Sequence, residues 1–331
     1  MHGWLVIDKP VGPGSTDIVS KVKRALREGG YSKVKVGHGG TLDPLASGVL
    51  PVALGEATKL AGRMLDADKV YDFTIRFGEQ TDTLDAEGHV VATSDARPSL
   101  AAVEAVLPSF TGAIDQIPPI YSALKVDGQR AYTLARAGAE VEMKTRAVTV
   151  YELEILPGTG RGSARSAVEG APSPASCQLE TPLHQPSAGP PPGPWEDQGE
   201  ITLRARVSKG TYIRSLARDI ALALGTVGHV TMLRRLKAGP FTLEGAISLD
   251  NLGEYANART LEQALLPLTA GLDDIPALPV TPDQAGALRQ GREVIGIAAK
   301  PGLHLATDLS VPVALVELHG EILRVVRGFN L

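Results

Sequence analysis

Apolar and polar residues alternate most regularly over Tyr71–Phe77, where every second side chain is aromatic or aliphatic. A period of two predicts a β-strand with one buried face. Short apolar runs predict further strands at Gly3–Ile7, Val148–Tyr151 and Ile201–Val207. Apolar residues spaced by three or four positions instead predict helices, at about residues 15–28, 99–107, 129–137 and 211–224. Strands and helices are therefore expected to be interspersed in this part of the chain.

The pattern changes near the C-terminus. Thr281 and Pro282 supply an N-cap and a first-turn proline for a helix that ends at about Gln290. Short strand patterns then follow at residues 294–298, 303–307, 311–318 and 322–326. This stretch is long enough for a small β-rich module and too short for an enzyme. We therefore expect two domains, one over residues 1–265 and one over residues 275–331.

Residues 157–199 interrupt the first domain with a stretch in which about half the residues are proline, glycine or serine. Such a composition cannot bury enough apolar surface to offset its ordering, so it predicts a disordered surface loop. If the strands on either side pair, the loop closes a hairpin. It also holds Cys177, the only cysteine, which excludes an intrachain disulfide and a cysteine-based zinc site.

Composition favours a globular cytoplasmic protein, with 43 % hydrophobic and 21 % charged residues. No apolar run approaches the ~18 residues of a membrane span, and the first residues lack the features of a signal peptide. The net charge is −4, but residues 201–240 carry eight basic residues against one acid. That block favours a local phosphate-binding face, and the alternative is solvated surface charge that happens to cluster.

The segment Gly37–Val52, with the sequence GHGGTLDPLASGVLPV, is the most unusual of the chain. Its glycines allow positive φ or a close approach of the backbone to another chain. Pro44 favours an extended Asp43, which holds that carboxylate at the rim of a loop. A lone Asp-Pro pair usually only initiates a turn, and the segment matches neither glycine-rich phosphate-binding motif.

The segment around Asp43 resembles the catalytic motif of the TruB family, the tRNA pseudouridine-55 synthases. Gly14 and Gly39 depart from that family's pattern, in which threonine or serine is common, and the 157–199 insertion departs from its compact members. The likeness spans residues 3 to about 240 outside the insertion. Six further motifs occur in the family's order: Asp8–Gly12, Lys69–Tyr71, Gln80–Gly88, Pro118–Lys125, Ser208–Arg214 and His229–Arg235.

The resemblance implies an α+β fold, with a mixed, mainly antiparallel sheet and flanking helices, followed by a β-rich RNA-binding module similar to a PUA domain. It implies an isomerase that converts uridine 55 in the T-loop of tRNA to pseudouridine, by base flipping. The N1–C1′ bond breaks and a C5–C1′ bond forms, without cofactor or metal. The expected partner is the T-arm of tRNA, recognised largely by shape, with no membrane and no obligatory protein partner, and the enzyme is expected to act as a monomer.

The resemblance also assigns roles to single residues. Asp43 is the expected nucleophile, and Arg214 pairs with it and keeps it ionised. Tyr71 packs against the target base, although core packing explains its place on the strand equally well. His38 fills the space that the flipped uridine leaves. The other expected substrate-binding residues line the pocket or contact phosphates: Tyr212, Leu233, Lys9, Lys125, Lys209 and Arg234.

Two other functions stay open at this point. One is a guide-RNA-dependent pseudouridine synthase of the dyskerin-like branch, and the other is a non-catalytic RNA-binding or tRNA-folding protein. The acidic average and the lack of long basic tails favour a stand-alone enzyme. A calcium site at Asp82, Asp85 and Glu87 is disfavoured because the spacing does not match an EF-hand loop, so we expect a turn at Asp85–Gly88.

Overall fold

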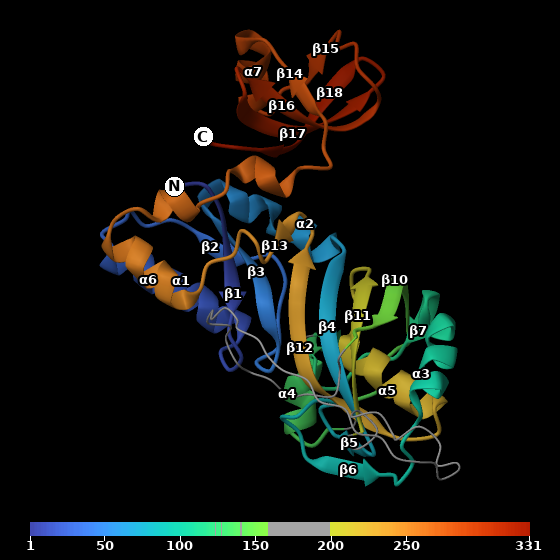
Figure 1. Ribbon diagram of the computed structural model, residues 1–331. Helices are drawn as coiled ribbons and strands as arrows, with labels where there is room; N and C mark the ends of the chain where they lie inside the picture. Colours follow the sequence, from blue (N-terminus) through green and yellow to red (C-terminus); the bar gives the residue numbers. More distant parts are fainter. Residues whose placement is uncertain (123, 127, 140, 158–198) are drawn as a thin grey trace, which may run out of the picture.

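The computed structural model describes residues 1–122, 124–126, 128–139, 141–157 and 199–331 (Figure 1). Nearly all of the 157–199 insertion, including Cys177, lies outside the described residues, so the expected disorder stays a prediction. The described chain forms a large sheet with helices beside it and a smaller, separate sheet at the C-terminal end (Figure 1).

The large sheet has nine strands and is mixed. Its strands pair antiparallel except for one parallel pair, β3 with β12, which confirms the expected mainly antiparallel sheet. The main path runs through β1 (Gly3–Lys9), β3 (Ser47–Leu54), β12 (Gly228–Ala238), β4 (Lys69–Phe77), β11 (Glu200–Val207), β10 (Arg146–Ile155) and β7 (Gly112–Gln116), with β2 (Val36–His38) beside β3 and β13 (Phe241–Thr242) beside β12.

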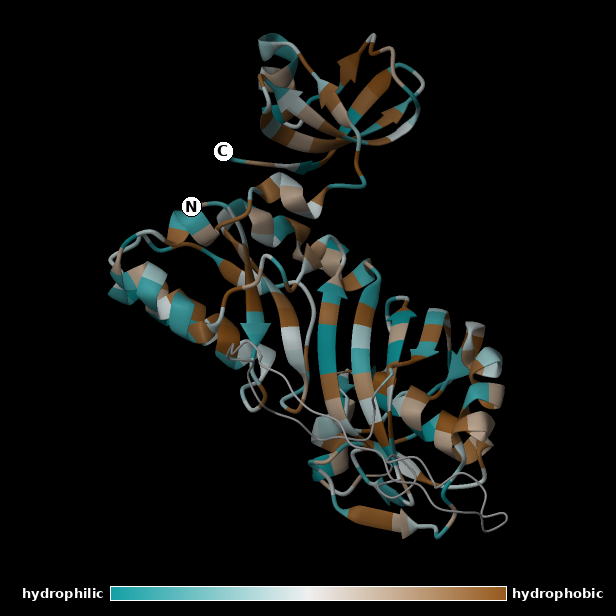
Figure 2. Cartoon of the chain, viewed as in Figure 1, coloured by the Kyte–Doolittle hydropathy of each residue, from teal (hydrophilic) through white to brown (hydrophobic). Residues whose placement is uncertain are grey.

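The alternating pattern of β4 produces two unlike faces on the central strands. Phe73 and Ile75 are fully buried in the main core. Asp72 and Arg76 point to the opposite, open face, where they meet charged side chains of β11. Figure 2 shows the same alternation of hydrophilic and hydrophobic residues along β4 and β12. The predicted strands at 148–151 and 201–207 do pair, as parts of β10 and β11, so the insertion connects two adjacent antiparallel strands.

The expected helices are present: α1 has the expected ends, and the other three are shorter by one or two residues at each end. Helix α1 begins at Ser15, but its N-cap is Gly14, and the Asp17 carboxylate accepts a hydrogen bond from the Gly14 backbone N–H at 2.9 Å. Ser15 is a helical residue and does not cap α1, because its hydroxyl bonds to the backbone of Leu42. The helices of this part are α1 (Ser15–Glu28), α2 (Ala61–Asp66), α3 (Leu100–Val106), α4 (Ala131–Arg136), α5 (Ile213–Ala223) and α6 (Leu249–Asn257), with 3-10 turns η1 (Gly55–Leu60), η2 (Leu107–Phe110), η3 (Leu261–Ala264) and η4 (Leu268–Gly271) and the hairpins β5 (Glu79–Thr81)–β6 (Val90–Thr93) and β8 (Lys125–Val126)–β9 (Gln129–Arg130).

The second sheet contains five strands and carries helix α7 (Pro282–Arg289) beside it. Thr281 caps α7 as expected, and its hydroxyl accepts from the backbone of Gln284. This arrangement confirms the β-rich C-terminal module. Its strands are β14 (Ala277–Pro279), β16 (Gly302–Asp308), β17 (Val311–His319), β18 (Ile322–Gly328) and β15 (Val294–Ile295), in that spatial order.

The C-terminal module packs against the first strands of the large sheet. Leu305, Leu315 and Phe329 belong to the same buried cluster as Trp4 and Met64. Backbone groups near the chain's end add polar contacts: the Gly328 carbonyl accepts from Lys59 Nζ at 2.8 Å, and the Asn330 N–H donates to a Glu56 carboxylate oxygen at 2.8 Å. Because the apolar packing is continuous, the division at 265–275 stays an expectation of the sequence.

Candidate functional site

A cleft of about 440 Å³ opens where the glycine-rich loop meets the start of β4, the start of α5 and the middle of β12. Five residues expected at a site, from four separate segments, line it together: Asp43, Tyr71, Tyr212, Arg214 and Leu233. Other residues that line the cleft have no role assigned by the sequence, among them Thr41, Lys69, Arg146, Ser208 and Arg235.

Arg214 bridges two carboxylates at the floor of this cleft. One terminal nitrogen lies 2.8 Å from an Asp43 carboxylate oxygen, and the other lies 3.1 Å from an Asp85 carboxylate oxygen. The same two nitrogens donate to the carbonyl oxygens of Thr83 and Tyr121 at 2.8 and 2.9 Å. A guanidinium that makes ion pairs and hydrogen bonds with four different groups is held in one orientation.

The three charged side chains differ sharply in exposure. The Arg214 and Asp85 side chains are 6 % and 3 % exposed, whereas that of Asp43 is 39 % exposed. The buried Arg214–Asp85 ion pair is thus a rigid support beneath the cleft, and Asp43 is the carboxylate that a ligand in the cleft can reach. An accessible carboxylate held against a permanent cation is suited to act as a nucleophile at neutral pH.

Asp85 is the functional residue that the sequence reasoning missed. The turn predicted over Asp85–Gly88 is present, and the Asp85 carboxylate accepts from the Thr83 hydroxyl at 2.6 Å and from the Glu87 N–H at 3.1 Å. Those local bonds are what a turn aspartate normally makes. Its other oxygen reaches Arg214, a contact between distant segments that spacing alone cannot reveal.

The loop that carries Asp43 is supported from beneath by buried side chains. The Ser15 hydroxyl accepts from the Leu42 N–H at 2.7 Å and donates to the Leu42 carbonyl at 3.0 Å. Lys9 is fully buried, and its ammonium donates to the carbonyls of Pro10, Pro13 and Pro44. Burial lowers the pKa of Lys9 to about 8. The structure thus places Lys9 under the loop and away from the surface where a phosphate contact was expected.

The walls of the cleft come from the edges of regular elements. Leu233 lies opposite Phe73 in the β4–β12 pairing, on the core face of the sheet, and is 7 % exposed. Tyr71 is half-buried two residues before Phe73 on the same face. Tyr212 is the N-cap residue of α5, and its backbone N–H donates to Gln116 Oε1 at 2.8 Å. Burial raises the pKa of Tyr212, so its hydroxyl is neutral at pH 7.

His38 ends strand β2 and lies outside the lining of the cleft. Its Nδ1 accepts from the Gly40 N–H at a long 3.4 Å. Burial, followed by the nearby positive charge of Arg235, lowers the pKa of His38 below its usual value of about 6.5. The ring is therefore neutral at pH 7, the form that stacks without a charge to desolvate.

The basic block of residues 201–240 is divided between the two faces of the sheet and helix α5, and the expected phosphate binding stays a prediction. Strand periodicity sends its members to both sides of the sheet, and acids pair with most of them. Arg234 pairs with Asp8 at 2.8 Å and Lys209 with Asp66 at 3.0 Å. Lys125 lies exposed on β8, apart from this block. Besides Arg214 with Asp43 and Asp85, the remaining pairs are Arg204 with Asp72, Arg206 with Asp68 and Glu152, and Arg218 with Asp219.

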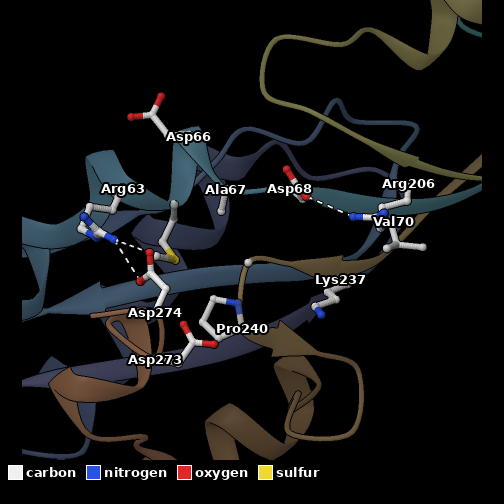
Figure 3. A pocket seen from close by; sticks show the side chains of 12 residues that line it. Arg63, Asp66, Ala67, Asp68, Val70, Arg206, Lys237, Pro240, Asp273 and Asp274 are labelled. Carbon is white, nitrogen blue, oxygen red and sulfur yellow. Dashed lines mark hydrogen bonds and ion pairs between the residues drawn. The ribbon is translucent and has the colours of Figure 1, made fainter. Parts of the chain in front are cut away.

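A second hollow, of about 410 Å³, lies beyond the first residues of β4 (Figure 3). Figure 3 shows Arg63 turned to Asp274 and Arg206 turned to Asp68 across its walls, and these are ion pairs of 2.9 and 3.3 Å. Acidic and basic side chains alternate around it, so it offers neither an anion nor a cation a consistent field.

Among the residues that the structure covers, no three acidic, histidine or cysteine side chains gather into a set that could ligate a metal ion. Within the same described ranges, no helix has the length and apolar character needed to cross a membrane.

Comparison with known proteins gives consistent matches. Two family profiles match the chain: "TruB family pseudouridylate synthase (N terminal domain)" over residues 26–169 and "tRNA pseudouridylate synthase B C-terminal domain" over residues 214–273. The tRNA pseudouridine synthase B of Novosphingobium aromaticivorans is 57 % identical over all of this chain and 98 % of its own length. That of Zymomonas mobilis is 55 % identical over all of this chain and 96 % of its own.

Solved structures agree on the fold. A chain of a Cbf5–Nop10–Gar1 complex superimposes with a TM-score of 0.68 at 26 % identity, over 99 % of this chain and 85 % of that one. A chain of an H/ACA ribonucleoprotein bound to a substrate RNA gives a TM-score of 0.66 at 24 % identity, over 99 % of this chain and 85 % of that one. The chain thus has a fold that is already known from solved structures.

Proposed function

The chain belongs to the TruB family of pseudouridylate synthases, and from that premise we propose that it isomerises uridine 55 to pseudouridine in the T-loop of tRNA. The observation that carries the proposal is the Asp43–Arg214–Asp85 arrangement at the floor of the cleft. It supplies an accessible carboxylate paired with a cation that a second, buried carboxylate fixes in place.

The reaction needs little beyond such a group. The N1–C1′ bond breaks, the uracil turns, a C5–C1′ bond forms, and a proton leaves C5 while one is gained at N1, so atoms and electrons balance within the substrate. Asp43 acts as the nucleophile in this scheme. Among the described residues that line the cleft, Asp43 is the one acidic residue. A bound substrate therefore meets a negatively charged side chain at that position alone.

The neighbouring side chains hold the flipped base. We assign Tyr71 and Leu233 to the apolar walls against which the uracil packs, and Tyr212 to the wall beside Arg214. We assign His38 to the gap left in the T-loop, because a neutral imidazole can stack there and offset part of the few kcal/mol that flipping costs.

Recognition of the rest of the T-arm falls to exposed cations and to the C-terminal module. Lys125 and Lys209 are exposed and are proposed as phosphate contacts, together with Arg146 at the cleft wall. We propose that residues 1–265 form the catalytic unit and residues 275–331 a PUA-like RNA-binding module. The buried Lys9 and the paired Arg234 are poorer phosphate contacts than the sequence suggested.

We propose that the protein acts alone, as a monomer without an obligatory protein partner, in the cytoplasm where tRNA is modified. The two bacterial relatives, which match over the whole chain, support this reading. The guide-dependent alternative draws on the likeness to a chain of the Cbf5–Nop10–Gar1 complex, which is more distant in sequence.

The test is an assay on an unmodified tRNA transcript labelled with tritium at uridine C5, without guide RNA or other proteins. Tritium release from position 55 is the expected result, and a transcript with cytidine 55 is the substrate control. Asp43→Asn should lower kcat by roughly 10⁴-fold with little change in tRNA affinity. Asp72→Asn, the matched loss of an aspartate on the open face, should leave kcat within a few-fold. Turnover that appears only with added guide RNA would support the alternative, and substantial turnover by Asp43→Asn would remove the role of that residue.

A further inference from the structure

Arg235 is a fully buried cation next to the cleft. It belongs to β12, and because side chains alternate along a strand it points to the core face while Arg234 points to the open face. Its Nε donates to the Val49 carbonyl at 2.8 Å. Its two terminal nitrogens donate to the carbonyls of Thr41 and Gly40, each at 3.3 Å.

The charge of Arg235 is balanced in an unusual way. The described residues contain no carboxylate in ion-pair contact with it, and the three carbonyl oxygens are its acceptors. Buried charges are normally paired because burial without compensation is costly. A neutral apolar side chain would suit strand packing at this position with less desolvation. The hydrogen bonds to the three carbonyls therefore account for the presence of a charged residue at this buried position.

The backbone below the guanidinium is fixed as tightly as its tip. Residue 235 lies opposite Gly48 in the parallel β3–β12 pairing, and Gly48 has a positive φ of 102°. A side chain at Gly48 would collide with the Arg235 carbonyl oxygen, so a glycine is needed for this close approach. The Arg235 side chain thus extends from a backbone position that is fixed in the sheet to the carbonyls of the loop.

Three side chains, those of Ser15, Lys9 and Arg235, support the loop by binding its backbone at different residues around Asp43. Ser15 binds Leu42, the residue before Asp43, and Lys9 binds Pro44, the residue after it. Arg235 binds the two residues that precede Leu42 and, of the three supports, is the one that also lines the cleft. Without it, Gly40 and Thr41 have no support of this kind, and glycine there permits many backbone conformations.

We propose that Arg235 is a positioning residue for the isomerisation, one that holds the Gly40–Thr41 backbone so that the Asp43 carboxylate keeps its place against Arg214. This proposal rests on the proposed function, since it concerns the same reaction. A shift of about 1 Å in a reacting group can cost on the order of 100-fold in rate. Loss of the Arg235 side chain should therefore slow the chemical step and spare tRNA binding.

The test uses the full-length Arg235→Ala variant in single-turnover assays on the tRNA transcript. We expect the rate constant to fall by about 100-fold while the tRNA dissociation constant stays within threefold. Millimolar guanidinium ion, added to fill the vacated space between the three carbonyls, should restore the rate at least several-fold without changing the dissociation constant. Arg204→Ala removes an arginine from the open face of the same sheet and should show neither the loss nor the rescue.

The remaining outcomes also decide the matter. A folded Arg235→Ala with a wild-type rate overturns the proposal, and so does an equal loss of rate and affinity, which would make Arg235 a binding residue. If thermal unfolding shows that Arg235→Ala is not folded at the assay temperature, Arg235→Lys replaces it. Because an ammonium lacks the planar fork that reaches three carbonyls, its rate should fall by about tenfold with unchanged affinity, and a wild-type rate would overturn the proposal. A wild-type protein without activity on tRNA would instead reject the proposed function.

Discussion

Arg234 and Arg235 are adjacent, identical in chemistry, and placed in opposite environments by the period of a β-strand. Arg234 is 36 % exposed on the open face of the sheet and pairs with Asp8. Arg235 is 1 % exposed on the core face and donates to loop carbonyls. The open face repeats the first pattern with Arg204–Asp72 and Arg76–Glu200. The comparison teaches that a count of basic residues says little about function until each side chain has been assigned to a face.

The two faces also differ in energy. An exposed ion pair contributes about 0–1 kcal/mol, because water and salt screen it. A buried donor or acceptor left without its partner costs about 1–3 kcal/mol, and more when it is charged. Equivalent substitutions on the two faces should therefore have unequal effects.

The largest difference is expected for the carboxylates that pair with arginine on each face. Asp85→Asn removes a charge from the buried contact with Arg214, and the freed guanidinium can then shift away from Asp43. We expect a fall in kcat of about 100-fold, measured on the tRNA transcript. Asp8→Asn removes the equivalent charge from the open-face pair with Arg234 and should keep kcat within threefold. Equal effects of the two variants on kcat would contradict the prediction that the buried pair matters more than the open-face pair.

An intermediate effect is expected from cations that differ in their access to RNA. Arg146 is exposed and lines the cleft, and no acid in the described part of the chain pairs with it. Arg146→Met should flatten the slope of log K against log salt by about 0.7–0.9, as the loss of one phosphate contact does. Arg234→Met should leave that slope unchanged. The measurement is tRNA binding by the Asp43→Asn protein over a salt series, and an unchanged slope for Arg146→Met would show that the cleft wall makes no phosphate contact.

The smallest effect concerns pH. The pKa of His38 is lowered in the folded state, so between that pKa and about 6.5 the unfolded chain binds more protons than the folded one. The contribution of His38 to the free energy of unfolding should therefore be present in full above pH 6.5, and it should be lost as the pH falls through the lowered pKa. His38→Gln removes this contribution, and denaturant unfolding at pH 5 to 7.5 should show a flatter dependence than the wild type. Parallel curves would mean that burial and Arg235 do not act on this ring.

The sequence predicted the parts of the fold that depend on local pattern. The alternation of Tyr71–Phe77 and the helical spacing of residues 15–28 gave β4 and α1 nearly at their observed ends. Strand β12 was not predicted, because its charged residues interrupt any apolar alternation and its pairing with β4 contains two register shifts. Strand β3 is not predicted by the sequence pattern, because glycine and proline, here Gly48 and Pro51, are uncommon inside strands. The pairing on both sides of β3 accommodates them.

The candidate site was predictable only through its motif residues. Asp43 and Arg214 were found by resemblance, and the structure brings them to 2.8 Å. Asp85 and Arg235 lie within two of the matching motifs but receive no role from the sequence, because their importance arises from contacts across 129 and 195 positions of sequence. Such contacts depend on the tertiary arrangement, and nothing in the spacing of a single sequence encodes them.

The shared packing of Trp4 and Phe329 has a consequence for how the protein is made. Trp4 leaves the ribosome long before Phe329, with most of this chain made between them. Domains usually begin to fold from the N-terminal side during synthesis. Here the cluster around Trp4 is completed by Leu305, Leu315 and Phe329, so this part of the nascent protein keeps apolar surface exposed until Phe329 has been made. A chain that stops short of Phe329 would thus leave an early-made region of the enzyme incompletely packed.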